Sequence, residues 1–138
     1  MNAQKYIPLV ARTFMAVIFL RSGMSKIAGF ADTQEQIASA GLPLAALVTV
    51  FTILFQLAGA VSLILGYKTR IGAVLIMLFL IPATLVFHNP IVDPSQMTQF
   101  MKNLAIIGGL LMAFAYGAGP ISLDRQVAPT ETAQYSKE

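Results

Sequence analysis

Four long apolar segments dominate the chain and limit the kind of fold that it can adopt. No Asp or Glu lies within any of them, and no charged residue occurs between Glu35 and Lys68. A helix that crosses the hydrocarbon layer of a membrane needs about 20 mostly apolar residues, because no water is present there to satisfy the backbone. The pattern predicts an all-α integral membrane protein, an antiparallel four-helix bundle, with helices over residues 6–27, 44–65, 70–87 and 101–116.

Two shorter regions complete the predicted organisation. Residues 29–43 link the first two spans and carry a helical pattern, in which Thr33 and Gln36 form a capping box and Gly41 marks the end. We therefore expect a short helix in this first outer loop. Residues 1–125 would form one membrane domain, and the polar tail, 126–138, is expected to be disordered.

The composition excludes several classes of function. The chain has no cysteine and one histidine, so one copy cannot form a disulfide, a thiol nucleophile, a bis-histidine haem site or a histidine-rich metal site. The net charge of +3 is small and spread along the chain, so nucleic acid is not an expected partner. Proton-coupled carriers generally need a titrating carboxylate inside the membrane, and all six acidic residues lie in the links or the tail.

The distribution of Lys and Arg predicts how the protein is oriented. Four spans place both termini on one side of the membrane, and cations are enriched on the cytoplasmic side. The side of the termini would carry Lys5, Arg12, Lys68, Arg70, Arg125 and Lys137, and the opposite side would carry Arg21, Lys26 and Lys102. This bias predicts that both termini are cytoplasmic.

Two polar residues, Arg12 and Gln56, are expected inside the membrane near its cytoplasmic side. From the helical rise per residue, Arg12 lies roughly 9 Å above the inner end of the first helix, and Gln56 lies roughly 15 Å above the turn at Gly66. An arginine side chain can bridge this difference, so we predict a hydrogen bond from Arg12 to the Gln56 carbonyl. In the alternative, Arg12 extends to the inner headgroups and Gln56 bonds to the backbone or to another helix.

A second polar group is predicted at the outer rim, where the ends of three spans converge. It contains Lys26, His88, Lys102 and Asn103, with Asp93 in the loop nearby. A basic rim with one histidine suits an anionic or quinone-like head group, or a docked protein. The alternative is a set of ordinary interfacial cations, with Asn103 as a helix cap and a solvated histidine.

The order and spacing of several motifs resemble the DoxX family of bacterial four-helix membrane proteins. They are Arg12 followed by GMSKIAGF (23–30), the turn LGYKTR (65–70), His88, FMKN (100–103) and GPISLD (119–124). The resemblance implies a bacterial inner-membrane protein. It also implies, as for some relatives, a link to quinone-coupled oxidation of sulfur compounds or to oxidative-stress complexes with soluble redox enzymes. Family members often have a glutamate where this chain has Gln56, which cannot neutralise Arg12.

These observations lead to three ranked hypotheses of function. The first is an accessory subunit of a redox or quinone-linked membrane system, which binds quinone or recruits a soluble redox enzyme and has no redox centre of its own. The second is a non-catalytic scaffold that assembles as a homo-oligomer or with a larger membrane complex. The third is a small-molecule carrier, which requires a continuous polar path from the outer rim to Arg12 and Gln56. The sequence identifies no catalytic residue.

Overall fold

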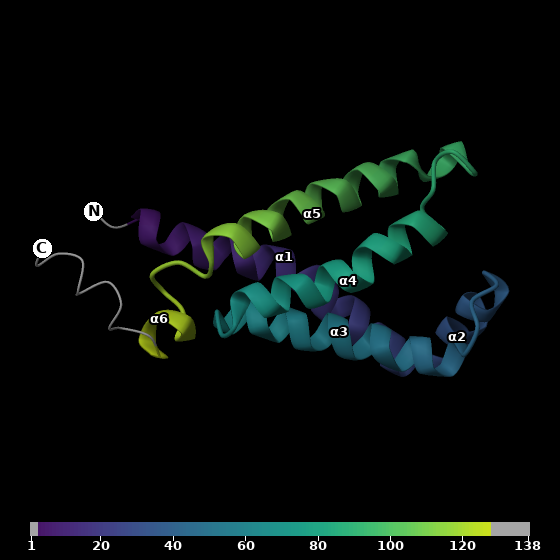
Figure 1. The fold of residues 1–138 in the computed structure, drawn as a ribbon, viewed down its shortest axis with the longest axis horizontal. Helices are drawn as coiled ribbons and strands as arrows, with labels where there is room; N and C mark the ends of the chain where they lie inside the picture. Colours follow the sequence, from purple (N-terminus) through teal and green to yellow (C-terminus); the bar gives the residue numbers. More distant parts are fainter. Residues whose placement is uncertain (1–2, 128–138) are drawn as a thin grey trace, which may run out of the picture.

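The structure, a computed structural model, describes residues 3–127 and consists of helices joined by short links (Figure 1). Four helices are long and apolar enough to cross a membrane: α1 (Ala3–Ala28), α3 (Ala45–Leu65), α4 (Thr69–Phe87) and α5 (Met97–Tyr116). The shorter elements are α2 (Phe30–Ser39), the 3-10 helix η1 (Pro94–Gln96) and α6 (Leu123–Val127). The described residues contain no strand, so the predicted all-α four-helix membrane architecture is confirmed.

Each long helix packs against the next one along the chain, in the order α1, α3, α4 and α5. α1 and α5 meet along a shorter contact, where the sulfur of Met15 occupies the space that a Cβ at Gly109 would need. The start of α1, the turn between α3 and α4, and α6 lie at one end of the bundle (Figure 1). α2 and η1 lie at the other end. We call these the terminal end and the loop end.

The expected short helix between the first two spans is present, but its start differs from the prediction. α2 begins at Phe30, so Thr33 lies inside its first turn, where its hydroxyl donates to the Gly29 carbonyl. The predicted capping box of Thr33 and Gln36 is therefore wrong. Gly41 follows the helix with a φ of +84°, the left-handed conformation that glycine adopts without a steric cost.

α5 begins at Met97, earlier than the predicted start at residue 101. The cause is the turn before it, in which Asp93 accepts hydrogen bonds from the amide and the hydroxyl of Ser95 and so starts η1. η1 continues directly into α5. At the other end of the chain, the predicted tail, 126–138, begins inside α6, and the disorder expected for it concerns residues beyond the described part.

α3 and α4 approach each other closely through glycine. A Cβ at Gly59 of α3 would lie 2.9 Å from the carbonyl oxygen of Gly72 on α4 and would also collide with the side chain of Ile76. Small residues at such a crossing let two membrane helices pack backbone to backbone. The apolar core surrounds this crossing and includes Ala16, Phe19, Ala60, Leu63, Ala73, Ile76, Leu80 and Leu110.

Many large apolar side chains lie on the outside of the bundle. Phe14 is 76% exposed, and Leu78 and Leu85 are also well exposed on α4. In contrast, the polar side chains of Arg12, Gln56 and Asn103 are buried inside the bundle. This inside-out distribution is expected for a multi-pass membrane protein, whose apolar surface faces lipid and whose polar side chains turn toward other helices.

Candidate functional site

The buried guanidinium of Arg12 joins three segments at the terminal end of the bundle. Its Nη1 donates to the carbonyl of Leu63 at 2.6 Å and to that of Ile64 at 3.4 Å, and its Nη2 donates to the carbonyl of Ile121 at 2.6 Å. Leu63 and Ile64 belong to the last turn of α3, where carbonyls have no intrahelical partner and carry the negative end of the helix dipole. Arg12 therefore caps α3 and holds the segment that precedes α6.

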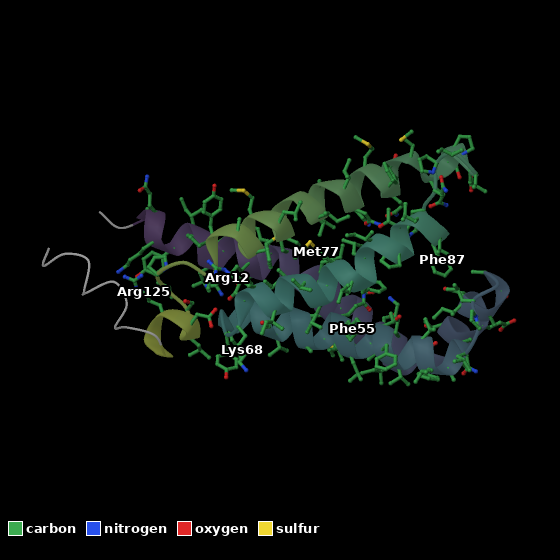
Figure 2. All side chains as sticks on the ribbon, in the orientation of Figure 1. Arg12, Phe55, Lys68, Met77, Phe87 and Arg125 are labelled. Atoms are coloured by element: carbon green, nitrogen blue, oxygen red, sulfur yellow. The ribbon has the colours of Figure 1, made fainter. Side chains whose placement is uncertain are left out.

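The tight turn between α3 and α4 is fixed by the same segment. Gly66 has a φ of +66°, and a Cβ there would lie 2.5 Å from Ser122 and 2.6 Å from Arg12. Asp124 accepts hydrogen bonds from the backbone amides of Lys68 at 2.6 Å and Thr69 at 3.0 Å, which are the free amides at the start of α4. The LGYKTR and GPISLD motifs thus form one interlocked unit (Figure 2).

Asp124 is held in its ionised form by this arrangement. Partial burial alone would raise the pKa of its carboxyl, but the hydrogen bonds from the amides of Thr69 and Lys68, together with the charge of Arg12, outweigh burial and lower the pKa. The ionised carboxylate then stabilises the start of α4, because negative charge is favourable at a helix N-terminus.

The predicted hydrogen bond from Arg12 to Gln56 is wrong. Gln56 is buried on α3, but its Nε2 donates to the hydroxyl of Ser22 on α1 at 3.2 Å, and its Oε1 has no partner among the described residues. The alternative for Gln56, a bond to another helix, is the one observed. The residues of α1 that are buried between Arg12 and Ser22 are Ala16 and Phe19, and both are apolar. Gln56 therefore belongs with the loop end.

Lys26 points back into the bundle. Its Nζ donates at 2.6 Å to the same Ser22 hydroxyl that accepts from Gln56, and it lies 5.7 Å from the centre of the Phe79 ring on α4. Ser22 is one helical turn deeper than Lys26, roughly 6 Å farther from the loop end. A lysine near the end of a membrane helix usually extends outward to the headgroups. Here the ammonium is directed inward, toward α3 and α4.

The rest of the predicted outer rim separates into different environments. Asn103 is buried and donates from Nδ2 to the hydroxyl of Thr84 at 3.0 Å, so it links α5 to α4 and does not cap a helix. Lys102 is exposed on α5. His88 is partly buried after the end of α4, and its Nδ1 lies 2.8 Å from Oε1 of Gln96. The structure therefore brings together Lys26 and His88, but not Lys102 or Asn103.

Lys26 and His88 line a cavity of about 580 Å³ between α2, α3 and α4 at the loop end. Its walls are mostly apolar: Phe51 and Phe55 on α3, and Phe79, Pro82 and Phe87 on α4. Figure 2 shows Phe55 and Phe87 on the two sides of this space, far from Arg12. In the described part of the chain, no Asp or Glu lines this cavity. The cavity can hold an apolar molecule that presents a hydrogen-bond acceptor or a negative charge to Lys26.

Sequence reasoning missed three contributors to these sites. Ser22 connects Lys26 to Gln56, and its position one turn before Lys26 is a signal that could have found it. Phe79 contacts the ammonium from another helix, for which the sequence holds no signal. The carbonyl of Ile121 completes the Arg12 site across 109 positions of the chain, and a backbone acceptor has no signature in a sequence.

Comparison with known proteins gives matches along most of the chain. A family model, DoxX, matches residues 7–89, which contain Arg12, Gln56 and all the lining residues of the cavity. The inner membrane protein YqjF of Escherichia coli is 35% identical over 117 residues, which cover 85% of this chain and 88% of that protein. The inner membrane protein YphA of E. coli is 32% identical over 130 residues, which cover 90% and 92%.

A more distant match is the ER-derived vesicles protein ERV29 of Saccharomyces cerevisiae. It is 31% identical over 81 residues, which cover 55% of this chain but only 26% of that protein. No solved structure matches the chain significantly.

Proposed function

Because the chain belongs to the DoxX family and is a multi-pass protein of the inner membrane, we propose that it is an accessory subunit of a quinone-linked redox system. It would bind a quinone in the loop-end cavity and present it to a partner, because a chain with no cysteine and one histidine offers few ligands for a redox centre of its own. The cavity is the single observation that carries this proposal.

The residues of the cavity fit a quinone head group. Its volume of about 580 Å³ is in the range of small-molecule sites, and its aromatic walls suit a flat ring. Lys26 lines the cavity and has donor hydrogens left after its bond to Ser22, so it could donate to a ring carbonyl. A bound quinone would supply the electron-carrying chemistry, and Lys26, His88 and the aromatic walls would bind and orient it.

The orientation proposed for the chain places both termini in the cytoplasm, in agreement with the bias of Lys and Arg toward that side. The cavity would then lie in the outer half of the membrane. A soluble redox enzyme would dock at the loop end, where Arg21 and Lys102 are exposed.

The proposal is tested by measuring quinone retained by the protein after purification in a mild detergent. Ala83 lines the cavity, so Ala83→Phe should fill it and lower the retained quinone at least tenfold. Ala105 is exposed on α5 away from the cavity, and Ala105→Phe is the matched control, which should retain quinone at the level of the unmodified chain. Absence of quinone from the unmodified protein, with no redox enzyme recovered alongside it, would reject the proposal.

A second candidate function is a scaffold for assembly, and one observation favours it. Gly108 faces outward on α5, and a Cβ built there meets nothing within 4 Å, which leaves room for a helix of another copy or another protein. Gly108→Cys should form a disulfide crosslink to a second copy if this face is an assembly interface. Crosslinking that is unchanged when Ala83→Phe is added would favour the scaffold over the quinone subunit.

A carrier is less well supported. The polar residues of the loop end stop at Gln56, and the hydrogen bonds of Arg12 within residues 3–127 all go to backbone carbonyls at the terminal end. The buried apolar side chains of Ala16 and Phe19 lie between them on α1. A carrier of polar molecules would have to open this segment.

A further inference from the structure

The loop-end cavity has an unbalanced charge, which points to a ligand more specific than a neutral quinone. Lys26 is partly buried inside a membrane helix, and its two contacts, the Ser22 hydroxyl and the Phe79 ring, carry no negative charge. A cation removed from water is costly unless it is paired, and an ionisable residue within a membrane span usually marks a functional site. Among the residues that the structure describes, the cavity wall therefore holds no counter-ion for the ammonium.

The direction of the Lys26 side chain shows where that counter-ion would lie. The ammonium turns away from the headgroups toward Ser22, and it contacts Phe79, roughly 13 Å inside the loop end of α4. Gln56 shares the Ser22 hydroxyl and so helps to hold it in place. A lysine exposed to water would not need a hydroxyl held in place by a buried side chain.

The walls of the cavity show the rest of the ligand. Phe51 is 48% exposed and Leu78 is 57% exposed, so the edges of the cavity on α3 and α4 are open and apolar where these helices would face lipid. Thr33, Gln36 and Ile37 of α2 lie over the cavity at the loop end. An apolar chain can therefore leave the cavity sideways into the bilayer.

The water-facing side of α2 is unfavourable for an anion. Asp32 and Glu35 are exposed there and line a second, shallower hollow next to Phe87. A small anion that approached from water would meet these two carboxylates first. An anion anchored in the membrane by an apolar chain would reach Lys26 from the lipid side and avoid them.

From these observations we infer that the loop-end cavity seats the head group of a single-chain amphiphile, an acyl or prenyl chain that ends in a carboxylate or a phosphate, with Lys26 as its ion-pair partner. This inference shares its cavity with the proposed function and does not depend on a redox role. Lys26 acts as the residue that selects for charge, and Ser22 and Gln56 position it.

The test uses the full chain in nanodiscs of phosphatidylcholine at pH 8. Binding of oleate is compared with binding of oleyl alcohol, and binding of oleoyl lysophosphatidate with that of monooleoylglycerol. The two members of each pair have the same hydrocarbon chain length and differ in the charge of the head group. We expect at least one anionic probe to bind at least tenfold more tightly than its neutral counterpart, and the stronger of the two identifies a carboxylate or a phosphate as the head group. Equal binding of charged and neutral probes in both pairs would overturn the inference.

Two variants and one control locate the effect. Lys26→Met should weaken the preferred anionic probe at least tenfold and change the neutral probe less than threefold. Gln56→Glu keeps Lys26 and places a carboxylate at the Ser22 hydroxyl, so it should also weaken the anionic probe. Lys102→Met, at an exposed lysine outside the cavity, should change neither. Unchanged anion binding by Lys26→Met would reject Lys26 as the partner.

Quinone binding, measured in the same nanodiscs, separates this inference from the proposed function. Tight binding of a quinone without any preference for anionic probes would reject the inference and retain the quinone subunit. Charge-selective binding of an anionic probe without quinone binding would do the reverse. If Ala83→Phe abolishes both, the two ligands use one cavity.

Discussion

The guanidinium of Arg12 is surrounded by backbone oxygen atoms and has no carboxylate hydrogen-bonded to it in the described part of the chain. The carbonyls of Leu63 and Ile64 lie at the negative end of α3, which explains how this cation is stabilised without an acid at position 56. A glutamate at that position would lie beside Ser22 and Lys26 rather than beside Arg12. Position 56 is therefore coupled to Ser22 and Lys26 at the loop end, not to the Arg12 site.

Replacement of Arg12 by methionine should strongly destabilise the protein. Arg12→Met leaves the carbonyls of Leu63 and Ile121 without their donor in a buried site, at a cost of about 3 kcal/mol. The measurement is reversible unfolding by SDS in mixed micelles. Arg21→Met, which removes an exposed arginine from the same helix, should change the free energy of unfolding by less than about 0.5 kcal/mol. Similar losses in both variants would contradict the structural role assigned to Arg12.

At the residue scale, the sequence predicted which side chains matter better than it predicted their partners. The apolar context of Arg12 and Gln56 indicated correctly that both are buried. The helical period gives the face on which a residue lies, but not how far one helix is shifted along another, and this shift pairs Gln56 with Ser22 instead of Arg12. Acceptors from the backbone, such as the Ile121 carbonyl, could not be predicted at all.

At the scale of elements, α3 and α4 form a hairpin that is tight at the terminal end and open at the loop end. Gly59 and Gly72 allow backbone contact in the tight half, and Asp124 holds the turn. The open half contains the cavity. The apolar runs predicted each of these helices. The sequence Asp93-Pro94-Ser95 indicated a turn or a helix start, but the apolar run of α5 alone placed its beginning at residue 101.

The glycine crossing between α3 and α4 should tolerate no added methyl group. Gly59→Ala and Gly72→Ala would each force the helices apart, because their Cβ atoms would collide with Ile76 and Ser62 respectively, at a cost of about 1–3 kcal/mol. Gly108→Ala is the matched control. Its Cβ meets open space within a helix, so it should be neutral or stabilise by up to about 1 kcal/mol. The same SDS titration measures all three, and a loss of stability in Gly108→Ala alone would contradict this packing.

The contact between α6 and the α3–α4 turn should weaken in acid. The pKa of Asp124 is lowered in the folded protein, so its carboxylate contributes stability that is fully present above its unfolded pKa of about 4 and is lost as pH falls through the folded value. The difference in Tm between the unmodified chain and Asp124→Ala should therefore be constant from pH 7 to 5 and shrink below about pH 4. Asp32→Ala, at an exposed site on α2, is the control. A difference in Tm that grows on acidification would contradict the sign of this effect.

At the scale of the whole molecule, the two ends of the bundle are built differently. The terminal end is locked by Arg12, Gly66 and Asp124, whose contacts join α1, the α3–α4 turn and the segment leading to α6. The loop end contains the cavity and the inward-facing Lys26. The terminal end is thus tied together by hydrogen bonds between distant segments, and the loop end holds the candidate binding site.

The proposed orientation is testable because the chain contains no cysteine. Tyr67→Cys places a thiol in the α3–α4 turn, and Val92→Cys places one in the loop before η1, where the side chain is 81% exposed. In intact spheroplasts, a membrane-impermeant maleimide should label Val92→Cys and should label Tyr67→Cys only after lysis. The opposite pattern would place both termini outside the cytoplasm.

The contact between Arg12 and Ile121 has a consequence for the time course of biosynthesis. The two residues are 109 positions apart, so at ribosomal rates of about 5–20 residues per second the donor waits roughly 5 to 20 s for its last acceptor. During this interval α1 is already available to the membrane with an arginine that is only partly satisfied. The Arg12 site can therefore be completed only after synthesis has reached Ile121, long after α1 itself has been made.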